Sequence, residues 1–270
     1  MSTVIEDRVE PDSHGGKVPL VELRDIGKSY GTIIALTGIS LRVNAGEVTC
    51  VLGDNGAGKS TLIKIIAGLH QQTEGTLLVD GNDTVLQSPK HALSLGIATV
   101  YQDLAVVGLM PVWRNFFLGQ ELRKGPLRML DIQAMRATTK EELMKMGIDL
   151  PDVDAPISSL SGGQRQCVAI SRAIYFGARV LILDEPTAAL GVKQSGTVLR
   201  YISAARDQGF GVVFITHNPH HAHLVGDHFV LLNRGQQKLD CTYDQITLEE
   251  LTQQMAGGDE LDTLSHELRH

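Results

Sequence analysis

Short apolar runs separated by turn-forming residues predict a β-rich first third of the chain. Residues 21–26, 39–43 and 48–52 alternate or run apolar, and residues 77–80 form a fourth such run. We expect turns at Gly38, at residues 44–46 and at Gly81. After Gly58 the apolar residues recur at helical spacing, which predicts a helix that Gly68 ends. Its apolar stripe is formed by Leu62, Ile65, Ile66 and Leu69.

Residues 90–160 are expected to be mainly helical and to form a lobe inserted into an α/β body. Asp131 is placed to cap a helix that ends at Gly147. The apolar side of this helix is formed by Met135, Leu143, Met144 and Met146.

Helices and strands alternate from Gly163 onward. A helix is followed by a strand over residues 180–183, a helix over 192–206 and a strand over 212–216. This order is typical of a parallel sheet with helices packed on it. A capping box formed by Thr247 and Glu250 is expected to start the last helix.

Composition narrows the class of protein. The 270 residues are 43% hydrophobic and 20% charged, which is ordinary for a soluble globular protein. The net charge of −7 argues against a nucleic-acid partner. Apolar runs stay well below the roughly 20 residues that span a bilayer, and the polar start of the chain does not resemble a secretion signal. We expect a cytosolic protein with a disordered tail over residues 1–18, a folded domain over 19–256 and a flexible tail over 257–270.

The three cysteines have neither metal-binding spacing nor a paired arrangement. Cys50, Cys167 and Cys241 have apolar neighbours, so we expect buried, reduced thiols.

The run over residues 48–52 leads directly into a loop that matches G-x-x-x-x-G-K-[ST] between a predicted strand and a predicted helix. Backbone N–H groups of such a loop surround phosphate oxygens, and the start of the helix adds positive potential. Lys59 is expected to neutralise the β- and γ-phosphates of ATP, as a catalytic and a binding residue, and Ser60 to offer its hydroxyl to Mg²⁺. The residues predicted to bind nucleotide here are Gly53, Asp54, Asn55, Gly56, Ala57, Gly58, Lys59, Ser60 and Thr61.

A second predicted strand ends in a pair of carboxylates. Asp184 follows the run over residues 180–183 and is expected to hold Mg²⁺, while Glu185 is placed to polarise the attacking water. An apolar strand ending in Asp-Glu is common by itself. In combination with the phosphate loop it predicts ATP hydrolysis.

The string Leu-Ser-Gly-Gly-Gln over residues 160–164 resembles the signature of the ATP-binding cassette (ABC) family. Ser161 is placed to cap a helix whose open N–H groups would form a second anion site. The resemblance implies that this site meets the γ-phosphate held by a second cassette, so that two chains sandwich two ATP molecules in a homodimer. It also implies an α/β P-loop NTPase fold with a mainly parallel core sheet, an N-terminal antiparallel β subdomain and a helical subdomain inserted at about 103–172. The residues that it assigns to the second anion site are Ser161, Gly162, Gly163 and Gln164.

Further positions match the family in order. The resemblance implies that Tyr30 stacks on adenine, although a surface tyrosine is the alternative. It implies that Gln102 contacts Mg²⁺ and the attacking water, and that His217 contacts the γ-phosphate during catalysis. Gly191 departs from the pattern, because many relatives have Asp at this place in the D-loop.

Four histidines over residues 217–223 raise the alternative of a metal site. His220 and His223 could share a helical face. A Mg-ATP site already explains His217, and no cysteine or acidic cluster lies nearby in the sequence.

Three longer strings, over residues 101–104, 115–121 and 185–192, are similar to bacterial monosaccharide importers of the ribose, xylose and fructose class. One cassette per chain fits the fructose-type branch. This resemblance implies a peripheral ATPase on the cytoplasmic side of the inner membrane, under a permease fed by a periplasmic sugar-binding protein. The alternative is a soluble ATPase outside transport, such as one that serves iron–sulfur cluster assembly.

Residues 103–121, which follow Gln102, carry many apolar side chains. They could form the groove that receives a cytoplasmic helix of the permease, or they could be ordinary core. The apolar residues are Leu109, Met110, Val112, Trp113, Phe116 and Phe117.

Overall fold

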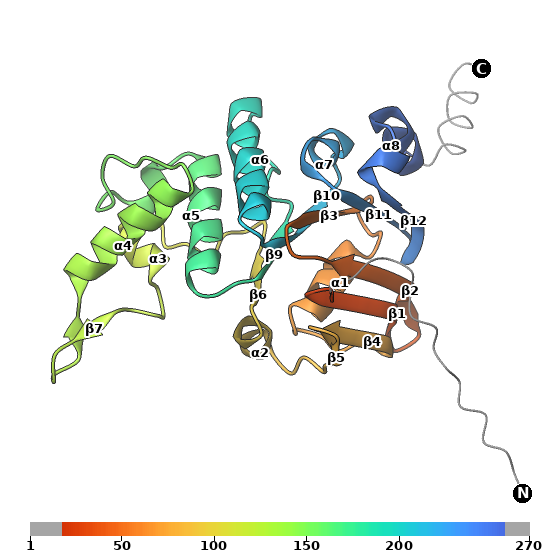
Figure 1. Cartoon of the computed structure of the whole chain (residues 1–270), viewed down its shortest axis with the longest axis horizontal. Helices are drawn as coiled ribbons and strands as arrows, with labels where there is room; N and C mark the ends of the chain where they lie inside the picture. The colour runs from red at the N-terminus through yellow and green to blue at the C-terminus, as the bar shows by residue number, and fades with distance from the viewer. Residues whose placement is uncertain (1–17, 257–270) are drawn as a thin grey trace, which may run out of the picture.

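The computed structural model describes residues 18–256, and its elements are labelled in Figure 1. Of the predicted tails over residues 1–18 and 257–270, residues 1–17 and 257–270 lie outside the described residues. The strands are β1 Val21–Tyr30, β2 Ile33–Val43, β3 Glu47–Leu52, β4 Glu74–Val79, β5 Asn82–Asp83, β6 Ile97–Val100, β7 Arg123–Lys124, β8 Met129–Leu130, β9 Val180–Asp184, β10 Gly211–Thr216, β11 His228–Asn233 and β12 Gln236–Thr242. The helices are α1 Lys59–Ile66, α2 Pro89–Ser94, α3 Val112–Phe116, α4 Ile132–Lys145, α5 Gly162–Tyr175, α6 Val192–Asp207, α7 Pro219–Val225 and α8 Leu248–Met255.

Ten strands form one mixed sheet in the order β5-β4-β1-β2-β12-β11-β3-β10-β9-β6. The strands β11, β3, β10, β9 and β6 run parallel to one another, while β12 pairs antiparallel with β11. The N-terminal strands β1, β2, β4 and β5 pair antiparallel. The predicted α/β class, with a mainly parallel core and an antiparallel N-terminal part, is therefore confirmed.

Side chains alternate between the two faces of β3. Cys50 belongs to one buried cluster with α5 and α6, while Val51 belongs to the other cluster with α1. A buried parallel strand with helices on both faces is apolar on both sides, which is why residues 48–52 run apolar instead of alternating. Both faces of the core sheet are thus covered by helices (Figure 1).

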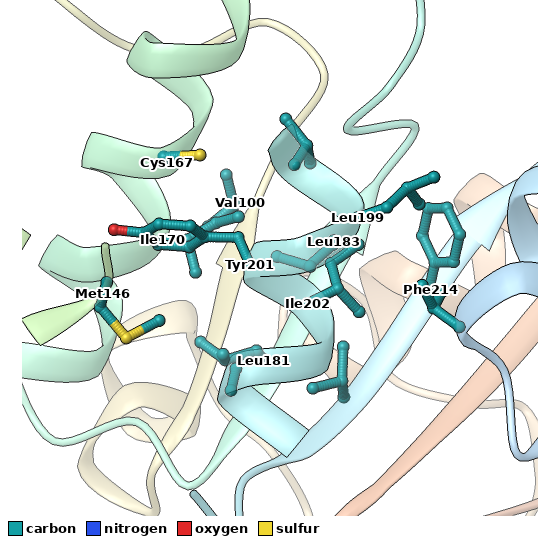
Figure 2. Packing of buried hydrophobic residues seen from close by; sticks show 14 of the residues in the cluster. Val100, Met146, Cys167, Ile170, Leu181, Leu183, Leu199, Tyr201, Ile202 and Phe214 are labelled. Atoms are coloured by element: carbon teal, nitrogen blue, oxygen red, sulfur yellow. The ribbon is translucent and has the colours of Figure 1, made fainter. Parts of the chain in front are cut away.

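Figure 2 shows part of the cluster that α5 and α6 form over the sheet. Tyr201 lies inside this cluster, and its hydroxyl pairs with Ser171 Oγ at 2.9 Å. Burial raises the pKa of the phenol, so it stays neutral. Cys50, Cys167 and Cys241 are buried free thiols, as the sequence predicted.

Two local predictions in the first third of the chain are wrong. Gly38 lies inside β2 and not in a turn, at an irregularity where the β1–β2 register shifts, and its φ of +61° explains why glycine stands there. Helix α1 ends at Ile66, so Leu69 lies beyond the helix and is 47% exposed.

The region over residues 90–160 has less helix than its composition predicts. It contains strand β6, the small β7–β8 hairpin and irregular chain around the short helix α3. Asp131 caps α4 by accepting a hydrogen bond from Ala134 N at 3.2 Å, as expected. Met144 was predicted on the buried side of α4, but it is 56% exposed. Among residues 18–256 no helix is long and apolar enough to cross a membrane.

Candidate functional site

The central strands end at one edge of the sheet, and the predicted site residues follow these ends. Parallel strands in register send their next residues to the same edge, where α/β proteins bind ligands. The register pairs Leu52 with Thr216, Asp184 with Ile215, and Leu183 with Val100. The edge therefore gathers the loops that begin with Gly53, Glu185, His217 and Tyr101.

The phosphate loop between β3 and α1 has a backbone path that requires glycine. Gly53 and Gly58 have φ values of +144° and +106°. A Cβ on Gly53 would lie 2.3 Å from the carbonyl oxygen of Leu232, and one on Gly58 would lie 2.6 Å from Cδ2 of Leu36. Both glycines therefore allow the loop to pack against β2 and the end of β11 while its backbone curls.

Lys59 is folded back onto this loop. Its ammonium donates to the carbonyl oxygen of Gly53 and, at 3.0 Å, to that of Asp54, and the residue is 8% exposed. Burial lowers the pKa of Lys59, while the carboxylates of Glu185, Asp54 and Asp184 act in the opposite direction. Helix α1 starts directly after this loop, and within the described chain no side chain caps it. The positive end of the helix dipole is therefore open toward the loop. The Lys59 ammonium and the uncapped start of α1 together favour the binding of an anion in this loop.

Asp184 and Glu185 lie at the end of β9. Burial and the charge of Glu185 raise the pKa of Asp184, against the effect of Lys59. The Glu185 side chain is 12% exposed, and its Oε1 lies 2.9 Å from Nδ1 of His217. The backbone of Glu185 has a φ of +48°, and its N–H donates to the carbonyl oxygen of Ile215 at 3.0 Å. The structure thus brings Glu185 and His217 together from two neighbouring strands.

Ser161 caps α5 as the sequence predicts. Gln164 N donates to Ser161 Oγ at 3.3 Å, and Ser161 N donates to Gln164 Oε1 at 2.9 Å. The adjacent glycines also have a packing role that the sequence did not reveal. A Cβ on Gly162 would lie 2.5 Å from Leu190 Cδ2, and one on Gly163 would lie 3.0 Å from the carbonyl oxygen of Gln194. The capped start of α5 therefore packs closely against Leu190 and against the first turn of α6.

Comparison with known proteins decides the family. The model described as ABC transporter matches residues 36–188. The chain is 42% identical over 236 residues to the Xylose/arabinose import ATP-binding protein XylG of Sulfolobus acidocaldarius, covering 87% of this chain and 93% of that one. The chain belongs to the ABC transporter family. The resemblance seen in the sequence is thus confirmed, and the chain is an ABC ATPase domain.

Other relatives of this ABC domain have similar names. The Fructose import ATP-binding protein FrcA of Rhizobium meliloti is 38% identical over 248 residues, with 90% of this chain and 95% of that one covered. The Ribose import ATP-binding protein RbsA of Yersinia pestis is 35% identical over 241 residues, which cover 89% of this chain and 47% of that protein.

Solved structures share the fold of this ABC domain. A nucleotide-free ATP-binding cassette from an ABC transporter aligns with a TM-score of 0.73 at 25% identity, covering 83% of this chain and 91% of that chain. The cassette MJ0796, solved as a dimer in a post-hydrolysis state with ADP and Pi, aligns with a TM-score of 0.68 at 26% identity, covering 83% and 98%.

Two further residues predicted for the ABC site, Gln102 and Tyr30, are exposed. Gln102 is exposed in the loop after β6, next to the strand that ends in Asp184. Tyr30 ends β1, is 40% exposed, and lies edge-on to His70 at 5.6 Å between ring centroids. The Lys28 ammonium lies 5.0 Å from the centroid of the Tyr30 ring. The Tyr30 ring therefore stays partly exposed, with His70 and the Lys28 ammonium beside it.

A groove of about 320 Å³ lies between α2, α5 and the loop that follows Gln102. The predicted apolar residues do not line it. Val112, Trp113, Phe116 and Phe117 are buried in the core, and Leu109 is 88% exposed. The lining from this loop is instead Asp103, Leu104, Ala105 and Val106, with Asn115 and Gln120 further along the chain.

Asn115 shapes the wall of this groove. Its side chain is buried, accepts from Val107 N at 2.8 Å, and donates to the carbonyl oxygens of Val107, Met110 and Pro111 at 3.1 Å each. The loop over residues 107–111 is thereby tied to the start of α3. The sequence contained Asn115 in one of the importer-like strings but gave no reason for it.

His221 makes a contact beside the candidate site that the sequence did not predict. Its Nδ1 pairs with Oγ1 of Thr187 at 3.0 Å, and Thr187 is 6% exposed. Burial and the neighbouring His220 and His217 lower the pKa of His221, so the ring stays neutral. The pair joins α7 to the segment that follows Glu185. No sequence signal separated His221 from its neighbours in the histidine run.

His223 makes a contact of a different kind. His223 packs against Tyr243 at 4.7 Å between ring centroids. Within residues 18–256 no group of three or more His, Cys, Asp or Glu residues has the geometry of a metal site.

Proposed function

We propose that this ABC domain is the ATP-hydrolysing, energy-coupling subunit of a monosaccharide importer. The observation that carries the proposal is the 42% identity to a sugar-import ATP-binding protein along 93% of that protein's length. The edge that gathers the phosphate loop, Glu185 and His217 supplies the chemistry that such a role needs. No observation favours a role in iron–sulfur cluster assembly, so we do not propose it.

ATP would bind with its phosphates in the loop formed by residues 53–61. Lys59 would exchange its two carbonyl contacts for the β- and γ-phosphate oxygens. Backbone N–H groups from Gly53 to Thr61 and the start of α1 would surround the same charge. Tyr30 would pack on the adenine from the end of β1.

The oxygen donors near the phosphate loop fit Mg²⁺. Ser60 and Asp184 offer hydroxyl and carboxylate oxygens, which this hard cation prefers, and Gln102 adds an amide oxygen from the neighbouring loop. Burial and the charge of Glu185 raise the pKa of Asp184, and a bound divalent cation would relieve the repulsion between the two carboxylates. When bound, Mg²⁺ neutralises charge on the β- and γ-phosphates.

Hydrolysis would be in-line attack of water on the γ-phosphorus. The new bond joins the water oxygen to phosphorus, the bond to the bridging oxygen breaks, and ADP leaves with its electron pair. Glu185 would accept the proton of the water, because its carboxylate is shielded and aimed by His217. Gln102 would orient the same water from the neighbouring loop after β6.

Two chains would complete each site. In Figure 1, α5 and α1 lie on opposite sides of β6, so the helix that Ser161 caps is apart from the helix that follows the phosphate loop of the same chain. Ser161, Gly162, Gly163 and Gln164 of a second copy would supply the remaining donors, in a two-fold dimer.

The groove beside α2 and α5 would receive a cytoplasmic helix of a membrane-spanning permease. Most of its lining residues are apolar, Val168 and Phe176 among them. Asp103 and Arg172 add charged side chains to the lining. An apolar groove with a few polar groups is the usual receptor for an amphipathic helix. This proposal places the chain on the cytoplasmic side of the inner membrane and implies a periplasmic sugar-binding protein upstream.

The transported sugar is a finer proposal. The importer-like strings are similar to those of the ribose, xylose and fructose class, and the one cassette found here fits the fructose-type branch; FrcA and XylG are named for fructose and for xylose/arabinose import. The permease and the binding protein would select the sugar, since the ATPase subunit would not contact the transported molecule.

Solubilised membranes provide the test. A tagged chain should co-purify with a polytopic membrane protein, and Ala169→Arg, which fills the groove, should reduce that recovery at least about tenfold because a buried unpaired charge opposes docking. The variant should still bind ATP. Ala137→Arg, on the exposed side of α4, is the matched control and should not change recovery. Recovery with soluble iron–sulfur proteins and without a permease would contradict the proposal.

A further inference from the structure

The β7–β8 hairpin presents large apolar side chains to solvent. Arg123 pairs with Leu130 and Lys124 with Met129 across its two short strands. Leu127 is 83% exposed, Met129 66% and Leu130 39%. Single exposed apolar residues are ordinary, but a contiguous group at the tip of a projection marks a contact surface.

The same segment is basic in an acidic chain. Residues 122–130 contain Arg123, Lys124 and Arg128 and no carboxylate, whereas the whole chain has a net charge of −7. All three cations belong to exposed residues. Lys124 forms an ion pair with Asp131 at 3.1 Å, and Arg123 and Arg128 add further positive charge. The surface therefore combines exposed apolar groups with cations.

The hairpin is an ordered projection. Arg128 N donates to the carbonyl oxygen of Gly125 at 3.0 Å within the turn, and Asp131 N donates to that of Leu122 at 2.8 Å at its base. These bonds fix the backbone, so little conformational entropy remains to be lost when the tip binds a surface.

Its position relates it to the proposed permease groove. Gln120 lines that groove, and β7 starts three residues later. In Figure 1 the hairpin projects beyond α4 toward the lower side of the view, where α2 also lies. A permease helix seated in the groove would bring the hairpin toward the bilayer, and this step rests on the proposed function.

We propose that the β7–β8 hairpin contacts the anionic lipid surface beside the permease. Leu127 and Met129 would enter the interface, and Arg123 and Arg128 would bind lipid phosphates, the division of roles that interfacial segments use. Exposed cations and exposed apolar side chains stand next to one another on this hairpin, which suits a lipid boundary better than the apolar groove of a protein. The contact with lipid is weak by itself. Once the permease holds the chain at the membrane, the hairpin meets lipid at a high effective concentration, so the two contacts strengthen each other.

Vesicle binding by the whole chain tests this inference without any permease. The unmodified protein should sediment with phosphatidylglycerol-containing vesicles, and not with pure phosphatidylcholine vesicles, at low salt. Arg123→Glu with Arg128→Glu should weaken binding at least about tenfold, because each cation near an anionic surface contributes on the order of 1 kcal/mol. Leu127→Ser with Met129→Ser should weaken it by a similar factor.

The matched control carries Lys238→Glu and Leu224→Ser, which remove an exposed cation and a 71% exposed leucine from β12 and α7. It should bind vesicles as the unmodified chain does, and all variants should retain ATP hydrolysis. Equal vesicle binding by hairpin variants and control would overturn the inference. Hairpin variants that keep vesicle binding but lose the permease would overturn it too, in favour of a protein contact. If the chain binds vesicles but no permease is recovered with it from solubilised membranes, the hairpin inference stands and the proposed importer function is contradicted.

Discussion

Replacing Glu185 with Gln should lower ATP hydrolysis by about a thousandfold while leaving ATP binding intact. The amide has the size of the carboxylate but cannot accept the proton of the attacking water. Because the Glu185 side chain is only 12% exposed and pairs with His217 at 2.9 Å, bulk water cannot readily replace it. ATP should then hold the two chains together, since hydrolysis no longer releases them.

Phosphate release and gel filtration with ATP measure both effects. The variant should elute as a dimer with ATP and as a monomer without nucleotide. Glu249→Gln, an exposed carboxylate in the first turn of α8, is the matched control and should hydrolyse ATP at the ordinary rate. An unchanged rate for Glu185→Gln would show that another group activates the water.

Gly53→Ala should destabilise the fold by about 3 kcal/mol, and the variant should lose ATP binding. The added Cβ would lie 2.3 Å from the carbonyl oxygen of Leu232 and 2.9 Å from Cβ of Ala57, at a φ of +144°. The loop must therefore move away from the end of β11, and its N–H groups leave the phosphate positions.

Urea unfolding and nucleotide binding check this result. Gly177→Ala is the matched control, since Gly177 has a φ of +94° but no atom within 4 Å of the added Cβ. It should cost only about 1 kcal/mol and leave ATP binding intact. Equal destabilisation by the two substitutions would show that backbone angle matters and that packing against Leu232 does not.

The sequence predicted the core of the fold because local and global signals agree there. The run over residues 48–52 and the glycine loop after it specify a buried strand, a turn and a helix whatever surrounds them. Loops between elements carry weaker signals. Gly38 has the angle of a turn residue, yet the neighbouring strands hold it inside β2. The boundaries of the helical insertion, about 103–172, stay a prediction.

The sequence placed Lys59, Ser161 and Glu185 in loops or at a helix start, where the structure has them, because motifs fix their order; their roles in the site stay a prediction. Contacts between distant segments were not predictable. The pairing of His221 with Thr187 depends on how α7 packs, and the sequence gave the same weight to each histidine of the run. The lining of the groove could not be predicted for a similar reason. The apolar residues over 112–117 pack in the core and do not line the groove.

The central claim is that each ATP site is built from two chains, and mixed dimers test it most directly. One chain carries Lys59→Ala, which disables its phosphate loop, and the other carries Ser161→Arg, which blocks its signature end. Each should be inactive alone. When mixed, half of the dimers contain one intact site, so hydrolysis should return to about a quarter of the unmodified rate. A mixture as inactive as its components would contradict the claim that two chains share each site.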